Sequence, residues 1–270
     1  MTIENNDESI HIQNSERIAS FNVIDRTPED EHQRLQFREA MYAFLAAVFL
    51  QPISEKFLQQ ISDQSFLTEL SDLFHGKAFN ELERYLTSLN QEDLGNEVDR
   101  LKREYMSLFA VPTGRYVAPF EDIYLGKNQN GQTHRGPLLG VRAIAVKRLY
   151  REAGAQMDYL RKELPNHVGV ELSFMRFLCE RQAHTFVAES EDAYSNMDSN
   201  EFSQWEVYRA YQIRFLSEHL NHWFPLLNEE IQEKSNQVFY RTISNLTQEY
   251  LAHDLESLKL QVVTNVQPVN

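Results

Sequence analysis

The sequence predicts an all-α protein with a single globular, bundle-like domain of about ten helices. Apolar residues recur at spacings of three and four over most of the 270-residue chain, as they do in amphipathic helices. No set of segments alternates apolar and polar residues as strands do, and no repeat at a solenoid period occurs. The 42% hydrophobic content is sufficient for a sizeable core.

The two ends of the chain differ from the part between them. Residues 1–27 are polar and acidic and show no sustained periodicity, so they cannot bury enough apolar surface to offset the entropy of ordering. We therefore expect a flexible acidic tail at 1–27, a single all-α domain at 28–260 and a flexible C-terminus at 261–270.

The first helix of the domain has clear start and stop signals. Thr27 can cap it, Pro28 suits its first turn, and acidic residues follow in that turn. Pro52 interrupts the periodic run, because proline has no backbone N–H and its ring clashes with the preceding turn. The sequence therefore predicts a long helix that begins near residue 28 and ends just before Pro52.

The later helices are predicted from the same periodicity, which is clearest at Leu101, Tyr105 and Leu108. Prolines and glycines interrupt residues 111–137, which predicts a long internal loop, and loops of this length are usually functional or disordered. Further helices are expected at about 54–62, 66–74, 78–88, 93–110, 138–153, 166–190, 200–223 and 226–258.

The charge balance excludes one class of partner. The chain has 26 Lys and Arg against 40 Asp and Glu, a formal net charge of -14, which repels phosphate backbones at long range. Nucleic acid is therefore not expected as a partner. A basic peptide or a basic client protein would be attracted instead.

Cysteine usage and the N-terminus bear on the compartment. Cys179 is the single cysteine, so no internal disulfide can form, and we expect a buried, inert thiol in a reducing compartment. The N-terminus is acidic and lacks the apolar core of a secretory signal. The longest apolar run, 40–50, is about half the length of a membrane-spanning helix. We expect a cytoplasmic protein without stable membrane insertion.

The stretch "LPNHVGVELSFM", residues 164–175, raises the question of an active site. His167 and Glu171 are four apart, so on a helix they point the same way. Asn166 follows a proline and is suited to cap that helix, and we expect His167 and Glu171 at the edge of the core. The buried stripe beside them is predicted to consist of Val168, Leu172 and Met175.

Two functional alternatives follow from these residues. His167, Glu171 and a third ligand such as His219 would make a metal-dependent hydrolase, since a catalytic zinc site takes three protein ligands. The chain lacks the HExxH pattern and any evident nucleophile and base, so we predict no catalytic residue, no metal and no cofactor. The hydrolase stays open as an alternative, as does a general peptide-binding adaptor.

The segment "EYMSLFAVPTGRYVAPFEDIY", residues 104–124, concentrates aromatic side chains around two prolines. Aromatic residues on a loop are typical anchors for peptide recognition. Leu108 and Phe109 also fit the end of a core helix, and both interpretations remain open for that pair.

Together with "FLSEHLNHWFPLL", residues 215–227, these stretches resemble the TorD/DmsD/NarJ family of molybdoenzyme maturation chaperones. The first motif, residues 104–124, is similar to the family's Tyr-x-x-Leu-Phe followed by a proline-aromatic-Glu-Ser turn. The second motif, residues 164–175, is similar to its Pro-Asp-His-x-x-x-Glu-Leu-x-Phe-Met signature, and the third motif, residues 215–227, is similar to Phe-Leu-x-x-His-Leu-x-x-Trp-x-Pro. The resemblance covers about residues 35–245.

The resemblance implies a cytoplasmic, non-catalytic chaperone, a monomer or a homodimer. Members of the family bind the apo form of a molybdopterin-containing catalytic subunit, often through its twin-arginine leader, until the cofactor is inserted. Carried onto this chain, the groove that binds the client or its peptide would involve Leu108, Phe109, Pro119, Phe120, Glu121, Asn166, His167 and Glu171.

Two positions depart from the family's pattern. Asn166 replaces the usual Asp, which deletes a charge that could pair with an arginine of the leader. Asp122 stands where Ser is common, and we expect that it moves an acidic contact to that position.

Overall fold

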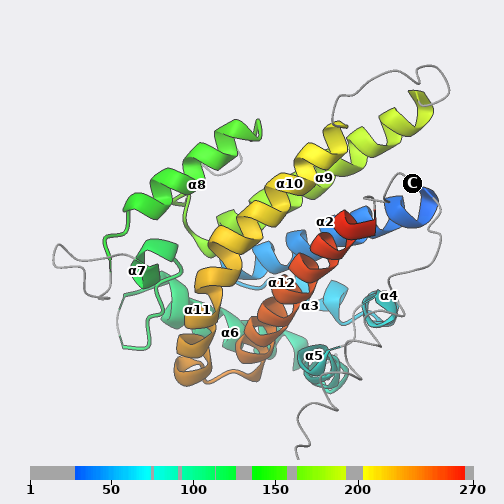
Figure 1. Cartoon of the computed structure of the whole chain (residues 1–270). Coiled ribbons are helices and arrows are strands. Elements are labelled where there is room, and N and C mark those ends of the chain that lie inside the picture. The colour runs from blue at the N-terminus through cyan, green and yellow to red at the C-terminus, as the bar shows by residue number, and fades with distance from the viewer. Residues whose placement is uncertain are drawn as a thin grey trace, which may run out of the picture.

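The computed structural model describes residues 28–73, 76–90, 93–112, 114–125, 136–156, 163–192 and 203–264. Helices dominate these residues, and the predicted all-α class is confirmed (Figure 1). The one β-type pairing within the described ranges is an isolated antiparallel bridge between Phe120 and His167. The expected tail at 1–27 and the last six residues lie outside the described residues.

The described part of the chain contains eleven α-helices and two π-helical turns, which agrees with the expected number because α10 and α11 are joined without a break. Their bounds are α2 Pro28–Leu50, α3 Glu55–Ile61, α4 Gln64–Leu73, α5 Lys77–Thr87, α6 Leu94–Tyr105, η2 Met106–Ala110, α7 Glu121–Leu125, α8 Val141–Glu152, α9 Val168–Asp192, α10 Gln204–Phe215, η4 Leu216–Leu220, α11 Asn221–Lys234 and α12 Val238–Thr264.

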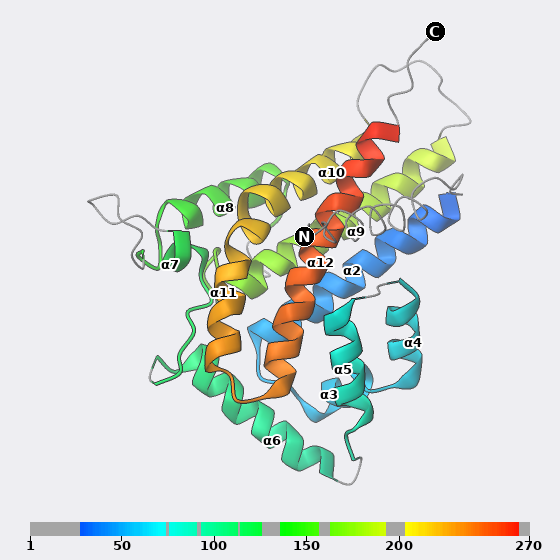
Figure 2. The ribbon, with the colours of Figure 1, turned by 60° about the horizontal axis from the view of Figure 1, so that its bottom comes forward.

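The long helices form the centre of the molecule. α2 packs along α9, α10 packs on α9, and α12 contacts α5, α10 and α11 (Figures 1 and 2). The short helices α3 to α6 lie at one end, and α7 and α8 lie at the opposite side near the start of α9 (Figure 2). No helix among the described residues is long and apolar enough to cross a membrane.

The sequence misplaced one helix boundary. The predicted break between 223 and 226 is wrong, because α10, η4 and α11 run continuously through Pro225. The helix continues there because its core side buries Trp223, Phe224 and Leu227, and burial of that size outweighs one lost backbone hydrogen bond.

The real break falls at residues 235–237, inside the helix predicted at 226–258. The buried carboxylate of Glu104 accepts hydrogen bonds from Ser235 Oγ at 2.9 Å and from the Asn236 amide at 2.6 Å. Arg115 also donates to Glu104, at 2.8 and 2.9 Å. These partners from outside the helix hold the turn between α11 and α12 in place.

The other differences from prediction are small. The expected loop at 111–137 contains α7, α9 begins at Val168 rather than at 166, and α12 continues to Thr264, beyond the predicted domain end at 260. The expected buried thiol is confirmed, since Cys179 is fully buried. Burial raises its pKa to about 12, which leaves a poorly nucleophilic thiol.

A buried ion pair joins the two long helices α2 and α12. Arg38 donates to both carboxylate oxygens of Asp254, at 2.6 and 2.9 Å, and also to Gln212 of α10. The hydroxyl of Tyr42 donates to Asp254 at 2.6 Å. Because both charges are buried, removing either partner would leave an uncompensated charge in the core.

The close contact between α2 and α9 depends on a glycine. A Cβ on Gly169 would lie 2.5 Å from Cγ of Leu50 and 3.3 Å from the carbonyl oxygen of Ala46. Since atoms cannot approach that closely, Gly169→Ala should separate the two helices and lower the free energy of unfolding by about 1–3 kcal/mol.

Gly95→Ala is the matched control. Gly95 lies in α6, and a Cβ there would meet nothing within 4 Å. It should raise stability by up to about 1 kcal/mol, because alanine favours the helix. Urea unfolding followed by circular dichroism measures both changes, and equal effects of the two substitutions would contradict the packing argument.

Candidate functional site

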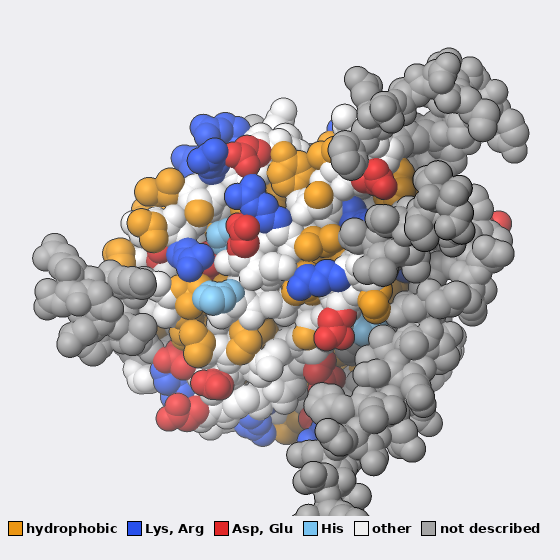
Figure 3. Space-filling model, in the orientation of Figure 1, with side chains coloured by type: hydrophobic (Ala, Val, Ile, Leu, Met, Phe, Trp, Pro, Cys, Tyr) orange, Lys and Arg blue, Asp and Glu red, His pale blue; other side chains and the backbone are white. Residues whose placement is uncertain are grey.

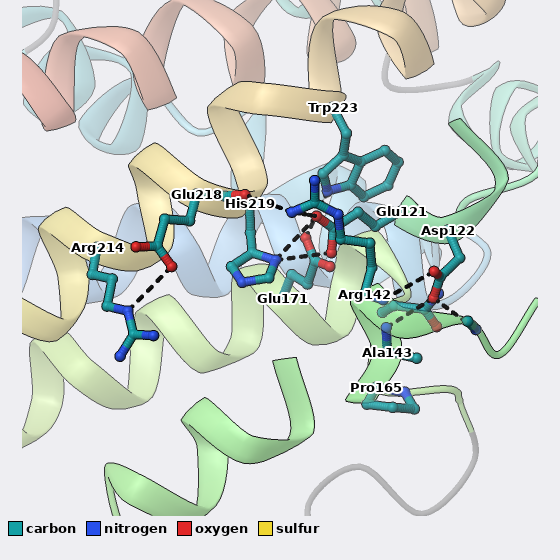
Figure 4. Close-up of polar contacts among 12 residues, drawn as sticks. Glu121, Asp122, Arg142, Ala143, Pro165, Glu171, Arg214, Glu218, His219 and Trp223 are labelled. Atoms are coloured by element: carbon teal, nitrogen blue, oxygen red, sulfur yellow. Dashed lines mark hydrogen bonds and ion pairs between the residues drawn. The ribbon is translucent and has the colours of Figure 1, made fainter. Parts of the chain in front are cut away.

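The three sequence motifs converge on one buried cluster, although they lie far apart in the chain. The bridge between Phe120 and His167 joins the first motif to the second, with the Glu121 amide donating to the Asn166 carbonyl at 3.0 Å and the Val168 amide to the Pro119 carbonyl at 2.9 Å. The third motif contributes side chains from η4 and α11 (Figure 4). The cluster is therefore the junction of α7, α8, α9 and the α10–α11 helix.

Asp122 caps helix α8 from a distance in the sequence. Its buried carboxylate accepts hydrogen bonds from the amides of Gly140 at 3.0 Å, Arg142 at 3.0 Å and Ala143 at 2.8 Å (Figure 4). A carboxylate at a helix N-terminus also interacts favourably with the helix dipole. The carboxylate is fully buried, so the expected acidic contact of Asp122 with a partner is wrong for this structure.

The sequence predicts that Asn166 caps α9, but this prediction is wrong. Its side-chain amide donates to Asp122 at 3.0 Å and to the Leu138 carbonyl at 3.1 Å. An aspartate here would bring a second carboxylate against Asp122 and would lack the donor. The two departures from the family's pattern therefore explain one another, because Asp122 supplies the acceptor and Asn166 the donor.

His167 is the residue that caps α9. Its Nδ1 accepts a hydrogen bond from the Gly169 amide at 3.0 Å, which places the proton of the neutral ring on Nε2. Burial lowers the pKa of His167 to about 4, so the ring is neutral at physiological pH. Its ring packs edge-on against Phe120, with centroids 5.3 Å apart.

Glu171 is fully buried beneath the bridge, so it does not lie at a polar edge as expected. Trp223 Nε1 donates to its Oε2 at 2.8 Å. Burial raises the pKa of Glu171 well above its usual value, and the neighbouring Glu121 raises it further. The hydrogen bond between Glu171 and Trp223 links α9 to α11.

Glu121 contacts the third motif through the His219 side chain. The Nδ1–H of His219 lies 3.0 and 2.9 Å from its two carboxylate oxygens, and Arg142 lies 3.9 Å away (Figure 4). Glu121 is fully buried and His219 is nearly so. The hydrogen bond from His219 of η4 and the nearby cation of Arg142 of α8 therefore compensate the buried carboxylate.

Most of the predicted binding residues are buried. Leu108 and Phe109 lie in η2, where the Phe109 ring packs against Phe49, Tyr105 and Tyr240. The Val117 amide donates to the Leu108 carbonyl at 2.7 Å and so aligns the segment that leads to the bridge. Phe120 alone is partly exposed, whereas the buried members of the set are Leu108, Phe109, Pro119, Glu121, Asn166, His167 and Glu171.

The residues of the hydrolase alternative are already engaged with protein groups. His167 accepts from a backbone amide, Glu171 accepts from Trp223, and His219 contacts Glu121. Within the described ranges, no group of three or more His, Cys, Asp or Glu side chains could hold a metal ion.

Sequence reasoning missed the parts of the cluster that depend on tertiary contacts. The sequence alone did not assign Trp223 or Arg142 to the candidate site, and it predicted an acidic contact for Asp122 rather than a helix cap. The third motif could have pointed to Trp223 and His219, because it contains both residues.

The Asp122–Asn166 pair yields a stability prediction. Asn166→Asp should lower the free energy of unfolding by about 3 kcal/mol, because two buried carboxylates would face each other. Adding Asp122→Ser should recover at least about 1 kcal/mol, since serine supplies a hydroxyl donor and still caps a helix. Urea unfolding of the single and double variants measures the coupling.

The exposed Asn80→Asp in α5 is the control and should change stability by less than about 0.5 kcal/mol. Strictly additive effects of the two substitutions at 122 and 166 would contradict the proposed exchange of donor and acceptor.

The low pKa of His167 predicts an acid-dependent loss of stability. The unfolded chain binds a proton near pH 6.5 and the folded chain only near pH 4, so protonation favours the unfolded state as the pH falls through this window. This group alone should lower the free energy of unfolding by about 2 kcal/mol between pH 7 and pH 5.

His167→Asn keeps a helix-capping acceptor but cannot titrate, so its stability should fall less over the same range. Urea unfolding at both pH values provides the comparison. Identical pH dependence of the variant and the natural sequence would show that His167 is not the responsible group.

Comparison with known proteins identifies the family. The family model described as the nitrate reductase delta subunit matches residues 75–229, which include all three motifs. The perchlorate reductase assembly chaperone protein of Dechloromonas aromatica is 29% identical over 119 residues, 44% of this chain and 47% of that relative.

Two proteins named chaperone protein TorD match over most of their length. That of Shewanella pealeana is 20% identical over 230 residues, which cover 84% of this chain and 92% of the relative. That of Vibrio cholerae is 22% identical over 225 residues, which cover 82% and 91%. The chain therefore belongs to the TorD/DmsD/NarJ family of maturation chaperones, the family predicted from its three motifs.

Proposed function

We propose that this chain is a system-specific chaperone for the catalytic subunit of a molybdopterin-containing oxidoreductase. It binds the apo form in the cytoplasm, assists insertion of the cofactor and releases the subunit for assembly or export. It catalyses no reaction itself and needs no metal or cofactor. The convergence of the three family motifs on one cluster carries this proposal, because motif residues from all three stretches contact one another there.

The client is proposed to bind over Phe120. This ring is partly exposed and is held edge-on against His167, so a client side chain can pack on it without unfolding the junction. An aromatic ring fixed by buried neighbours loses little conformational freedom on binding. The other predicted residues act by holding Phe120 and the segment before it in place.

The twin-arginine leader is the proposed ligand wherever the client has one. Its apolar part would pack near Phe120, and its arginines would pair with nearby acids. Asp122 cannot serve as one of those acids without leaving the α8 cap. A client that lacks a leader would bind through its mature chain.

Gentle affinity purification of the tagged full chain from its native host tests the proposal. We expect to recover the catalytic subunit of a molybdoenzyme in its apo form, and recovery of no such subunit would contradict the proposal. Binding of the purified subunit with and without its leader then distinguishes the two modes of recognition.

Phe120→Ala should weaken binding of that subunit roughly tenfold, about 1.4 kcal/mol, because the exposed ring is lost while the junction remains. The matched control is Phe57→Ala in α3, a partly exposed phenylalanine that stacks on Phe44 far from the junction. Titration of labelled subunit with each variant measures the affinity. Equal weakening by both substitutions would mean that the effect is one of stability.

A further inference from the structure

The start of α8 exposes an unusual number of apolar side chains. Ten large hydrophobic side chains are exposed among the described residues, and four of them lie within residues 138–144. Their exposed fractions are 50% for Leu138, 61% for Leu139, 73% for Val141 and 71% for Ile144. Clustered apolar surface of this kind marks interaction sites, whereas single exposed residues do not.

The exposure is not a failure of the helix to pack. The opposite side of α8 buries Ala143, Val146, Leu149 and Tyr150, and Asp122 fixes its N-terminus. α8 is therefore held rigidly with one side in the core and the apolar side chains outward. A fixed helix presents a docking surface at little entropic cost.

The outward side of α8 continues as a basic surface. Val141, Ile144, Arg148 and Arg151 follow one another at spacings of three and four, so they share one side of the helix. Lys147 is exposed beside them. Figure 3 shows orange and blue side chains together in the region where Figure 1 places α8. We call Leu138, Leu139, Val141, Ile144, Lys147, Arg148 and Arg151 the α8 surface.

These cations stand out on an acidic protein. α8 has four basic residues and one acid, whereas the whole chain has a net charge of -14. Arg148 pairs with Glu152 at 2.6 Å. Within the described part of the chain, neither Lys147 nor Arg151 has an ion-pair partner. The last turns of α8 therefore carry positive charge that is available to a partner.

We propose that the α8 surface docks an acidic amphipathic helix from the mature part of the client. The apolar first turn takes the apolar stripe of that helix, and Lys147 and Arg151 pair with its acids. The partner is the client only if the proposed function holds. The arginines of a leader would meet like charge here, so the α8 surface is a contact separate from the one at Phe120.

The length of the α8 surface and the electrostatic field of the acidic protein favour a single helix as the partner over a larger anionic surface such as a membrane. From Val141 to Arg151 the outward side is about 15 Å long, which matches about three turns of a partner helix. An anionic bilayer would face the whole acidic molecule and be repelled. A single helix meets mainly the charges within a Debye length, about 8–10 Å, which are those of α8.

Fluorescence anisotropy with the full chain and labelled synthetic peptides tests this docking. The probe is a three-turn amphipathic helix with leucines along one side and glutamates in its last turns, and the control peptide has lysines in place of those glutamates. We expect the glutamate peptide to bind at least tenfold more tightly and to weaken as salt is raised. Equal affinities of the two peptides would overturn the proposal.

Variants of the chain locate the contact. Val141→Ser with Ile144→Ser, and Lys147→Glu with Arg151→Glu, should each weaken the glutamate peptide at least tenfold, since all four side chains are exposed and their loss spares the core. The matched control is Val238→Ser with Leu260→Ser, which removes apolar side chains that are 48% and 40% exposed elsewhere. Unchanged binding in the α8 variants would overturn the proposal, as would tight binding to phosphatidylglycerol vesicles that displaces the peptide.

The purified client separates this inference from the proposed function. If the natural sequence retains the client and the α8 variants retain it equally, the docking surface is wrong and the proposed function stands. If the natural sequence recovers no molybdoenzyme subunit, the proposed function fails, and the peptide titrations still decide whether α8 binds acidic helices.

Discussion

The junction of this protein depends on the buried carboxylate of Asp122. A buried carboxylate needs several hydrogen-bond donors to compensate its lost hydration. Here three backbone amides at the start of α8 and the side chain of Asn166 supply these hydrogen bonds. These bonds fix α8 against α7 and against the start of α9. Because the segment before Asp122 pairs with His167, the same anchor also determines where Phe120 lies.

The buried cluster limits its uncompensated charge by protonation and pairing. Burial lowers the pKa of His167 to about 4, and burial together with Glu121 raises the pKa of Glu171, so both shifts favour the neutral forms. Glu121 accepts a hydrogen bond from His219. Residues that resemble half of an active site when read along the chain therefore join helices.

Two kinds of exposed surface lie beside this junction. Phe120 offers a fixed aromatic ring, whereas the α8 surface offers apolar side chains followed by cations. Both depend on the same anchor, since Asp122 holds the start of α8 and the segment of Phe120. In the proposed function, separate contacts would help to hold a large apo-subunit, because linked weak contacts bind more tightly together than either does alone.

The sequence by itself determined the all-α class, most helix positions and the family, because periodicity, capping signals and short motifs are local properties. It could not show that Asp122 caps a helix some twenty residues away, that Asn166 donates to it, or that His167 takes over the cap of α9. It also placed a break near Pro225, where burial of Trp223 keeps the helix intact. Only the tertiary structure decided these points, because hydrogen-bond partners, burial and pKa depend on which distant segments meet.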